Sequence, residues 1–359
     1  MPGVYISFPF CAQKCTYCNF ASGVFPRSLE DDYGKALVAE IEAHPFEWRP
    51  ETVYLGGGTP SSMDLDALRA VLKVIPGRPW KEATLEASPG TVTMERARAW
   101  AAAGIDRVSL GVQSFVQPEI AATGRKHTAE TVLADLETLR QAGIVNYNID
   151  LIAGLAGQTM ASWGESLDWT ARLSPPHVSV YMLEVDEDSR LGREMLLGGV
   201  RYGAGRTPSD SETADMYETA VERLTGLGIP RYEISNFAKP GWESAHNLKY
   251  WQLEPYAGFG ADAHSFDGRM RRQNVESPAG YVARSCPPAP QAASPEEKFF
   301  VGLRLSRGVR LSGEERLLYE APIRRFVGAG LLETSGDRLR LTSRGVLLSN
   351  EVFQEFLSL

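Results

Sequence analysis

The sequence lacks several features, and each absence excludes a class of protein. Four cysteines in 359 residues are too few for a disulfide-rich secreted scaffold. No stretch approaches the roughly 20 apolar residues that span a bilayer, and the N-terminus has no basic segment followed by a long apolar run. A net charge of −8 argues against a broad nucleic-acid surface. We therefore expect a cytoplasmic protein with no membrane span, at most a peripheral membrane contact, and no nucleic-acid partner.

Apolar residues follow a repeated pattern in the first half of the chain. A short apolar run rich in β-branched residues precedes a loop and an amphipathic helical pattern each time. The runs predict strands at 4–7, 52–55, 84–87, 107–111, 146–152 and 178–183. The intervening patterns predict helices near 29–43, 65–74, 93–103, 131–142 and 163–173. Alternating strands and helices favour a parallel sheet, and six units fall short of a closed eight-unit barrel. We predict an α/β fold with a partial (β/α)6 barrel.

Three of the predicted helix starts carry the spacing of a capping box. The pairs are Ser28 with Asp31, Ser61 with Asp64, and Ser162 with Glu165. We expect these side chains to satisfy the free backbone N–H groups of the first helical turns.

The second half of the chain is less regular. Residues 190–205 are rich in Gly and Arg and predict a loop, a helix is expected at 211–227, and Cys286 to Pro290 reads as a linker. The final residues predict a hairpin at 331–334 and 339–342 between helices, which indicates a small winged-helix-like domain. The predicted division is a partial barrel at 1–228, an extension of the barrel at 229–285 and a C-terminal domain at 286–359.

Polar residues fall at the ends of several predicted strands. Gly56 to Thr59 follow the second strand, Glu86 ends the third, Gln113 follows the fourth, and Asp150 lies near the end of the fifth. In parallel α/β folds the carboxyl ends of the strands meet at one rim, where ligands bind. Unpaired polar groups are costly inside a sheet, so we expect these residues to form a site.

Cys11, Cys15 and Cys18 form a C-x3-C-x2-C array after the first strand. Three thiolates at this spacing can hold three irons of a [4Fe–4S] cluster, which leaves the fourth iron open to a small molecule with an amine and a carboxylate. A zinc site completed by His246 or His264 is the first alternative, but the sequence has no second cysteine pair. A redox dithiol is the weaker alternative, because it needs no third cysteine. Cys286 lies in the linker and is expected to take no part.

The segments from Tyr5 to Phe20 and from Gly56 to Pro60 resemble radical S-adenosylmethionine (SAM) proteins of the oxygen-independent coproporphyrinogen III oxidase group. Within that group the chain resembles the haem chaperone branch along nearly its whole length. The resemblance implies a [4Fe–4S] cluster on the three cysteines, and SAM bound beside it. It implies SAM contacts at Tyr5, Tyr17, Gly57, Gly58, Thr59, Glu86, Gln113, Arg125 and Asp150. An arginine suits the SAM carboxylate because it can bind both oxygens at once.

A later element, His246-Asn247-Leu248-Lys249-Tyr250-Trp251, is similar to a segment of haem chaperones. The resemblance implies haem binding by His246, Tyr250 and Trp251, since imidazole is the commonest axial ligand and aromatic rings can pack on a porphyrin. The alternative is a hydrogen-bonded core histidine. His264 is a weaker candidate for the same role.

Two functions share the predicted rim. One is a haem chaperone that receives haem and passes it to acceptor haem proteins of the respiratory chain, with an electron donor for the cluster. The other is an enzyme that decarboxylates coproporphyrinogen. The oxidases carry a further cysteine two positions after the third ligand, where this chain has Phe20, and a longer extension before the first ligand. These departures favour the chaperone, and no catalytic residue is assigned. A zinc-bound scaffold is the third alternative.

Overall fold

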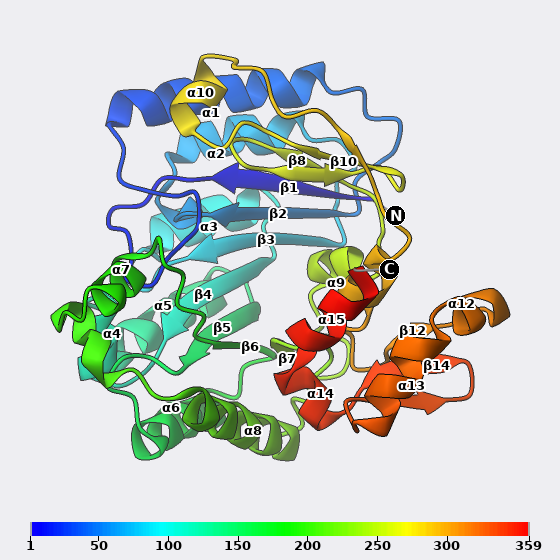
Figure 1. Cartoon of the computed structure of the whole chain (residues 1–359). Helices are drawn as coiled ribbons and strands as arrows, with labels where there is room; N and C mark the ends of the chain where they lie inside the picture. Colours follow the sequence, from blue (N-terminus) through cyan, green and yellow to red (C-terminus); the bar gives the residue numbers. More distant parts are fainter. Residues whose placement is uncertain (1, 358–359) are drawn as a thin grey trace.

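The computed structural model describes residues 2–357 and contains one large sheet and one small sheet (Figure 1). The large sheet has eleven strands in the order β11-β10-β9-β8-β1-β2-β3-β4-β5-β6-β7. Its six central strands are β1 (Gly3–Phe8), β2 (Thr52–Gly57), β3 (Glu82–Ala87), β4 (Arg107–Gln113), β5 (Asn146–Ala153) and β6 (His177–Met182). Neighbours among these six pair in parallel, as the alternating pattern predicts. The sheet does not close on itself, which confirms a partial barrel.

Helices cover the convex face of this sheet (Figure 1). They are α1 (Arg27–Ala43), η1 (Pro60–Ser62), α2 (Leu65–Val74), α3 (Met94–Ala102), α4 (Gln117–Ala122), α5 (Ala129–Gln141) and α6 (Met160–Leu173). The apolar stripes of these helices pack against Ile6, Leu55 and Val108, which are all fully buried. Burying such stripes against a sheet is the main stabilising term of the barrel.

The sheet is extended at both edges by strands that the sequence pattern did not predict. β7 (Asn236–Ala238) pairs antiparallel with β6, and β8 (Tyr256–Phe259) pairs in parallel with β1. β9 (His264–Phe266), β10 (Met270–Gln273) and β11 (Gln291–Ala292) continue the second edge. The helices of this part are α7 (Arg190–Leu196), η2 (Arg201–Arg206), α8 (Asp210–Gly226), α9 (Ala245–Trp251) and α10 (Pro278–Val282). The loop predicted at 190–205 is therefore wrong, because α7 and η2 lie there.

The C-terminal elements form a separate small sheet with helices around it. The sheet has the order β12-β14-β13, with β12 (Val309–Arg310), β13 (Leu332–Ser335) and β14 (Arg338–Leu341). The helices are α11 (Glu297–Gly302), α12 (Gly313–Leu318), α13 (Glu320–Gly328), α14 (Ser343–Leu347) and α15 (Ser349–Leu357). β13 and β14 are the hairpin that the sequence predicts. A three-stranded antiparallel sheet with short helices agrees with a winged-helix-like arrangement.

All three predicted capping boxes are wrong. α1 begins after Pro26 with no side-chain cap, and the N-cap of α2 is Asp64 itself, which accepts from two backbone N–H groups. Thr159 caps α6 in a box with Ser162. Ser61 is fully buried and its hydroxyl accepts a hydrogen bond from Thr91 Oγ1 at 2.7 Å. The Ser61 hydroxyl therefore bonds to Thr91 and does not cap α2.

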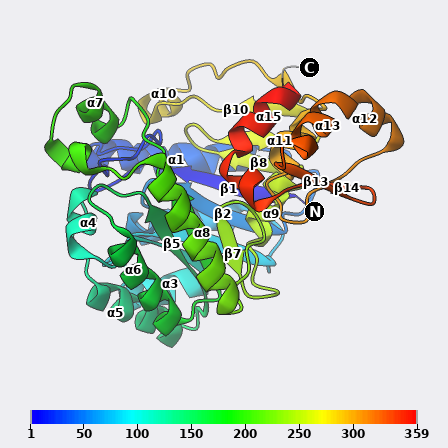
Figure 2. The same ribbon diagram turned by 60° about the horizontal axis from the view of Figure 1, so that its bottom comes forward.

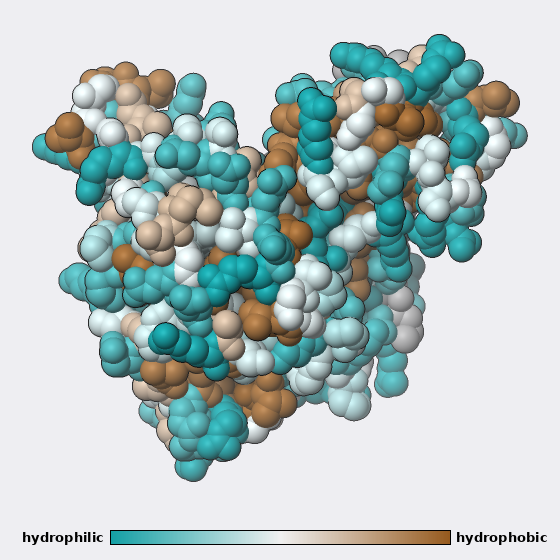
Figure 3. Space-filling model, turned by 90° about the horizontal axis from the view of Figure 1, so that it is seen from below, coloured by the Kyte–Doolittle hydropathy of each residue, from teal (hydrophilic) through white to brown (hydrophobic). Residues whose placement is uncertain are grey.

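The two ends of the barrel face different parts of the chain (Figure 1). The arrowheads of β1 to β6 point towards the loop after β1, α4 and α7, and we call this end the rim. The amino ends of the same strands point towards α9 and the C-terminal elements, and we call this end the floor. A turned view shows α6 and α8 side by side over the strands near β6 (Figure 2). From below, apolar residues are scattered over two lobes separated by a notch (Figure 3).

Candidate cluster and cofactor site

The three cysteines lie on the loop between β1 and α1, at the rim. Cys11, Cys15 and Cys18 are all unpaired thiols and half-buried. The loop is attached to the end of α4, where Thr16 N donates to Thr123 O at 3.1 Å and Thr16 Oγ1 donates to Ala122 O at 3.0 Å. These bonds hold the cysteine loop over the strands that end beside it.

The glycine turn after β2 is bonded to the same loop through the backbone. Gly58 N donates to Phe8 O at 2.8 Å, and Thr59 N donates to Phe10 O at 2.9 Å. A Cβ on Gly58 would lie 2.7 Å from Phe10 O, and Gly57 has a φ of +107°. Only glycine fits these two positions, because one has no room for a side chain and the other has a left-handed backbone.

Glu86 lies between the glycine turn and the barrel interior. Its Oε1 accepts from Tyr54 OH at 2.9 Å and its Oε2 accepts from Gly57 N at 3.2 Å. Burial raises the pKa of this carboxyl to about 7, and the charge of Asp150 adds to the rise. A buried carboxylate is suited to receive an ammonium group, because the cation would offset the cost of the buried charge.

Arg125 links the cysteine loop to β4. Its Nε donates to Cys15 Sγ at 3.3 Å, and its Nη1 donates to Gly111 O at 2.6 Å. Gln113, two residues further along β4, has a φ of +69° at an irregularity of the β4–β5 pairing. Such a backbone is uncommon for a residue other than glycine, and it is typical of functional sites.

Asp150 faces the barrel interior from β5. Its Oδ1 accepts from Asn148 Nδ2 at 2.6 Å, and its Oδ2 accepts from Ser109 Oγ at 3.3 Å. Burial raises the pKa of the Asp150 carboxyl. Tyr5 on β1 lies beside Tyr54, with ring centroids 6.2 Å apart. The nine residues that the resemblance gives for SAM are therefore all found at the rim or on the inward face below it.

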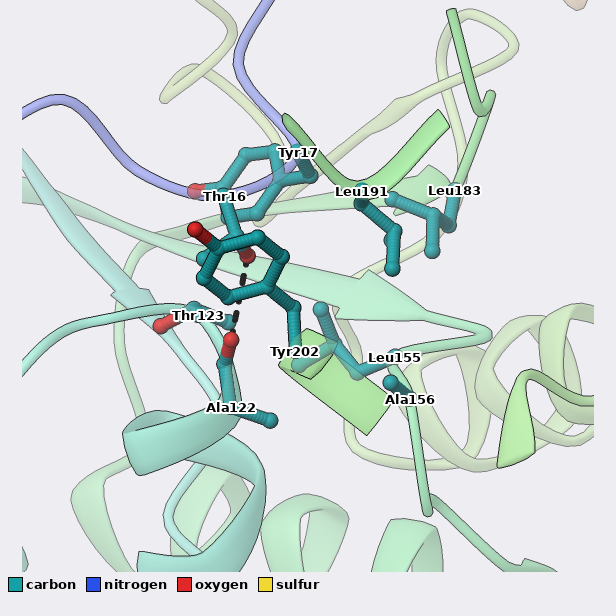
Figure 4. Close-up of a pocket in the computed structure, with 9 residues that line it drawn as sticks. All are labelled: Thr16, Tyr17, Ala122, Thr123, Leu155, Ala156, Leu183, Leu191 and Tyr202. Atoms are coloured by element: carbon teal, nitrogen blue, oxygen red, sulfur yellow. Dashed lines mark hydrogen bonds between the residues drawn. The ribbon is translucent and has the colours of Figure 1, made fainter. Parts of the chain in front are cut away.

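A small, mostly apolar cavity adjoins the cysteine loop (Figure 4). Tyr17 and Thr16 form one wall, and the hydrogen bond from Thr16 to Ala122 crosses it. Leu155 lies on the opposite wall, and Leu191 and Tyr202 come from α7 and η2. The sequence analysis missed Leu155, Leu191 and Tyr202. Leu191 and Met195 are four residues apart, which is a helical spacing, but the many glycines in that stretch predict a loop.

The cysteine side chains do not yet converge on one point. Within residues 2–357, no three Cys, His, Asp or Glu side chains are arranged as a ready metal site. The donor set nevertheless fits an iron–sulfur cluster, since all three thiols are free and share one loop held to the rim. Burial raises the pKa of Cys11, while hydrogen bonds from Thr59 and Ser22 act in the opposite direction.

The predicted haem residues lie on α9, at the floor rather than at the rim (Figure 1). His246 is fully buried; its Nδ1 lies 2.8 Å from Thr52 Oγ1, and its Nε2 lies 2.8 Å from Tyr250 OH. Burial lowers the pKa of His246 to about 3. The indole of Trp251 is 4.4 Å from the guanidinium of Arg304. Axial ligation by His246 would require one of its two hydrogen bonds to break, and His264 on β9 is exposed and lies elsewhere.

Comparisons with known proteins cover the whole chain. The model of the Radical SAM superfamily matches residues 5–170, and the model of the HemN C-terminal domain matches residues 290–348. Haem chaperone HemW of Lactococcus lactis is 33% identical over 98% of this chain and 96% of that protein. Haem chaperone HemW of Bacillus subtilis is 33% identical over 99% of both chains. The chain belongs to the HemW family. This confirms the family, and the branch of it, that the sequence resemblance predicts.

A solved structure supports the fold assigned to this HemW family member. Coproporphyrinogen III oxidase HemN from Escherichia coli, a radical SAM enzyme, superimposes with a TM-score of 0.81. The match covers 99% of this chain and 90% of that one, at 20% sequence identity. At this identity the likeness shows the fold, including the C-terminal elements, and does not choose between chaperone and oxidase.

The helices of this HemW-family chain are short or polar relative to a membrane-spanning helix. Within residues 2–357, no helix is both long enough and apolar enough to cross a membrane. This agrees with the absence of a long apolar run in the sequence.

Proposed function

We propose that this chain is a cytoplasmic haem chaperone that binds a [4Fe–4S] cluster through Cys11, Cys15 and Cys18. In this proposal SAM binds the cluster at the rim, haem is the cargo, and the recipients are haem proteins of the respiratory chain. An electron donor reduces the cluster. The proposal is supported by membership of the HemW family together with the geometry of the rim.

The observation that carries the proposal is the convergence of three separate parts of the chain around the cysteine loop. The glycine turn is bonded to it through the backbone, and Arg125 donates to Cys15 from beyond α4. Glu86 lies below the turn with its carboxylate on Gly57 N. Bound there, the cluster would supply an electron to the sulfonium of SAM.

The roles of this chain's own residues follow from their chemistry. In this proposal Glu86 would receive the amino group of SAM, and Arg125 would receive its carboxylate. Gln113 and Asp150 line the space below and would contact the ribose of SAM. Tyr17 lies on the cysteine loop itself, and Tyr5 and Tyr17 would flank the SAM site.

The first experiment is anaerobic reconstitution followed by electron paramagnetic resonance of the reduced protein with and without SAM. We expect a cluster signal that SAM shifts. Cys15→Ser is expected to abolish the signal, while Cys286→Ser, in an exposed thiol, is the matched control and should leave it unchanged. Bound zinc without labile sulfide would contradict the proposal.

The same preparation separates the chaperone from the oxidase. We expect a stoichiometric haem spectrum on titration with haem, and no decarboxylated product from coproporphyrinogen III in the presence of SAM and reductant. Product formed over many turnovers would assign the oxidase activity instead. His246→Ala tests the proposed contribution of α9: an unchanged haem spectrum and affinity would remove His246 from the haem site.

A further inference from the structure

A row of unsatisfied polar atoms crosses three adjacent strands on the inward face of the floor. The row consists of Thr84 on β3, Arg107 on β4 and Asn146 on β5. The three are register partners, since Thr84 pairs with Arg107 and Arg107 pairs with Asn146. Their buried atoms Thr84 Oγ1, Arg107 Nε and Asn146 Oδ1 have no hydrogen-bond partner among residues 2–357.

The inward direction of the row follows from strand alternation. Ser109, two residues after Arg107, donates to Asp150 inside the barrel, and Asn148, two residues after Asn146, donates to the same carboxylate. Successive odd or even positions of a strand share a face. Arg107 and Asn146 therefore point into the same interior, one step further from the rim.

Arg107 differs from Lys249, the other buried cation among residues 2–357, in having no carboxylate within ion-pair distance. It is 1% exposed and, within the described part of the chain, forms no ion pair or hydrogen bond through its guanidinium. Lys249, by contrast, pairs with both Glu51 and Glu254. A buried guanidinium without a partner is costly, so a structure keeps one only where something offsets the cost.

The nearest interior carboxylates are already committed to other donors. Glu86 accepts from Tyr54 and from the backbone of Gly57. Asp150 accepts from Ser109 and Asn148. Neither carboxylate lies within hydrogen-bond or ion-pair distance of Arg107, although the charge of Arg107 opposes the rise in the pKa of both carboxyls. The unpaired Nε of Arg107 therefore remains available to a group that comes from outside the chain.

The interior above the row is open to solvent rather than packed shut. Tyr181, on the inward face of β6, is 42% exposed, and Tyr54 and Asp150 are half-buried. The inward face between the rim and Arg107 is therefore partly exposed to solvent, and Arg107 lies at its buried end. Arginine binds carboxylates through a planar pair of donors, and a threonine hydroxyl can add a third.

We propose that Arg107, with Thr84, forms a carboxylate-binding site at the floor of the barrel, which takes a propionate group of the tetrapyrrole. That the ligand is a tetrapyrrole propionate rests on the proposed haem function. That the site prefers a carboxylate does not. It lies on the same floor as α9, since Tyr54 of β2, paired beside Thr84, also packs against the ring of His246 at 5.2 Å. SAM, in contrast, has its own arginine at the rim.

The test compares haem with haem dimethyl ester, in which both propionates are neutral. We expect the wild-type full chain to bind haem about tenfold more tightly than the ester, as a charged, bidentate contact would give. Arg107→Gln should remove this preference by weakening haem binding about tenfold, with the affinity for the ester changed less than about twofold. Arg98→Gln, in an exposed residue of α3, is the matched control and should retain the preference.

Two further measurements keep the outcome decisive. Arg107→Lys and Thr84→Val each lose part of the donor set, so both should reduce the preference for haem over its ester if Arg107→Gln does not fold. Equal affinity of the wild type for haem and ester, or an equal loss of both ligands in these variants, would overturn the proposal. Arg107 would then be an internal structural charge.

A probe without the tetrapyrrole separates the site from the haem function. ¹³C-labelled propionate should show saturable binding to the wild type by nuclear magnetic resonance, and none to Arg107→Gln. If propionate binds but haem does not, the haem function fails and the carboxylate site stands. If the wild type binds neither, both fail.

Discussion

The carboxylate of Glu82 accepts a hydrogen bond from the backbone N–H of His246 at 2.9 Å. The same carboxylate accepts from Ala245 N at 2.9 Å and from Ser244 Oγ at 3.2 Å. Glu82 is the first residue of β3 and is 5% exposed, so a strand of the barrel satisfies the free N–H groups at the start of α9. Glu82 therefore holds the start of α9 against the floor, together with the contacts of Thr52 with His246 and of Glu51 with Lys249.

Glu82→Gln should lower the free energy of unfolding by about 2–3 kcal/mol, because an amide offers one acceptor oxygen where the carboxylate offers two. Urea unfolding followed by circular dichroism measures the change. Glu95→Gln, in the exposed first turn of α3, is the control and should stay within about 0.5 kcal/mol of the wild type. Equal unfolding of both variants would show that Glu82 does not hold α9.

Gly58→Ala should weaken SAM binding and destabilise the rim. The added Cβ would lie 2.7 Å from Phe10 O and 2.8 Å from Phe8 O, which are backbone atoms that cannot rotate away. The cysteine loop and the glycine turn would have to separate, at a cost of about 2 kcal/mol or more. Calorimetric SAM titration of the reconstituted protein is the measurement. Gly226→Ala adds a Cβ with no atom within 4 Å and should bind SAM normally.

Glu86 should make the stability of the cluster-free chain fall as the pH rises. Its pKa is raised from 4.5 to about 7 in the folded chain, first by burial, so between these values the folded state binds more protons than the unfolded state. Stability contributed by protonated Glu86 is present below about pH 4.5 and is lost towards pH 7, by up to about 3 kcal/mol. Urea unfolding at several pH values, compared with Glu86→Gln, isolates this contribution. A wild-type profile parallel to that of the variant would contradict the raised pKa.

Asp64→Ala should destabilise the chain by about 1 kcal/mol, because Asp64 Oδ1 accepts from Asp66 N at 2.9 Å and from Ala67 N at 3.1 Å as the N-cap of α2. Ser28→Ala should be close to neutral, since Ser28 lies inside the first turn of α1 and is exposed. Thermal unfolding of the two variants side by side makes the comparison. A larger loss at Ser28 would restore the cap that the sequence spacing predicts there.

The parallel core of the fold could be predicted because its signal is local. Each of the six predicted strands overlaps an observed strand, since buried parallel strands read as continuous apolar runs. The edge strands could not be found in this way: β7 and β9 have three residues each and β11 has two, which is too short for a periodic pattern. Their position depends on pairing with strands that are distant in the sequence.

The rim could also be anticipated, because Glu86, Gln113 and Asp150 are polar where a buried strand ends. The polar residues at the floor could not be anticipated in this way. Thr84, Arg107 and Asn146 lie at or near the beginnings of their strands, where polar residues are ordinary, and only the register between strands aligns them. The capping boxes failed for a similar reason, since Ser61 has the correct spacing but is occupied by Thr91 from the next loop. The predicted division of the chain at 228 and 285 stays a prediction.

Strand β4 begins with Arg107 at the floor and ends with Gln113 at the rim, and each of these residues is a proposed ligand contact. A hydrogen-bonded strand in the middle of a sheet is stiff, so its two ends are not independent. If occupation of one end alters affinity at the other, thermodynamic linkage requires the effect to be equal in both directions. The strand would then couple the binding of the cargo to the binding of the cofactor, although the two ligands do not touch.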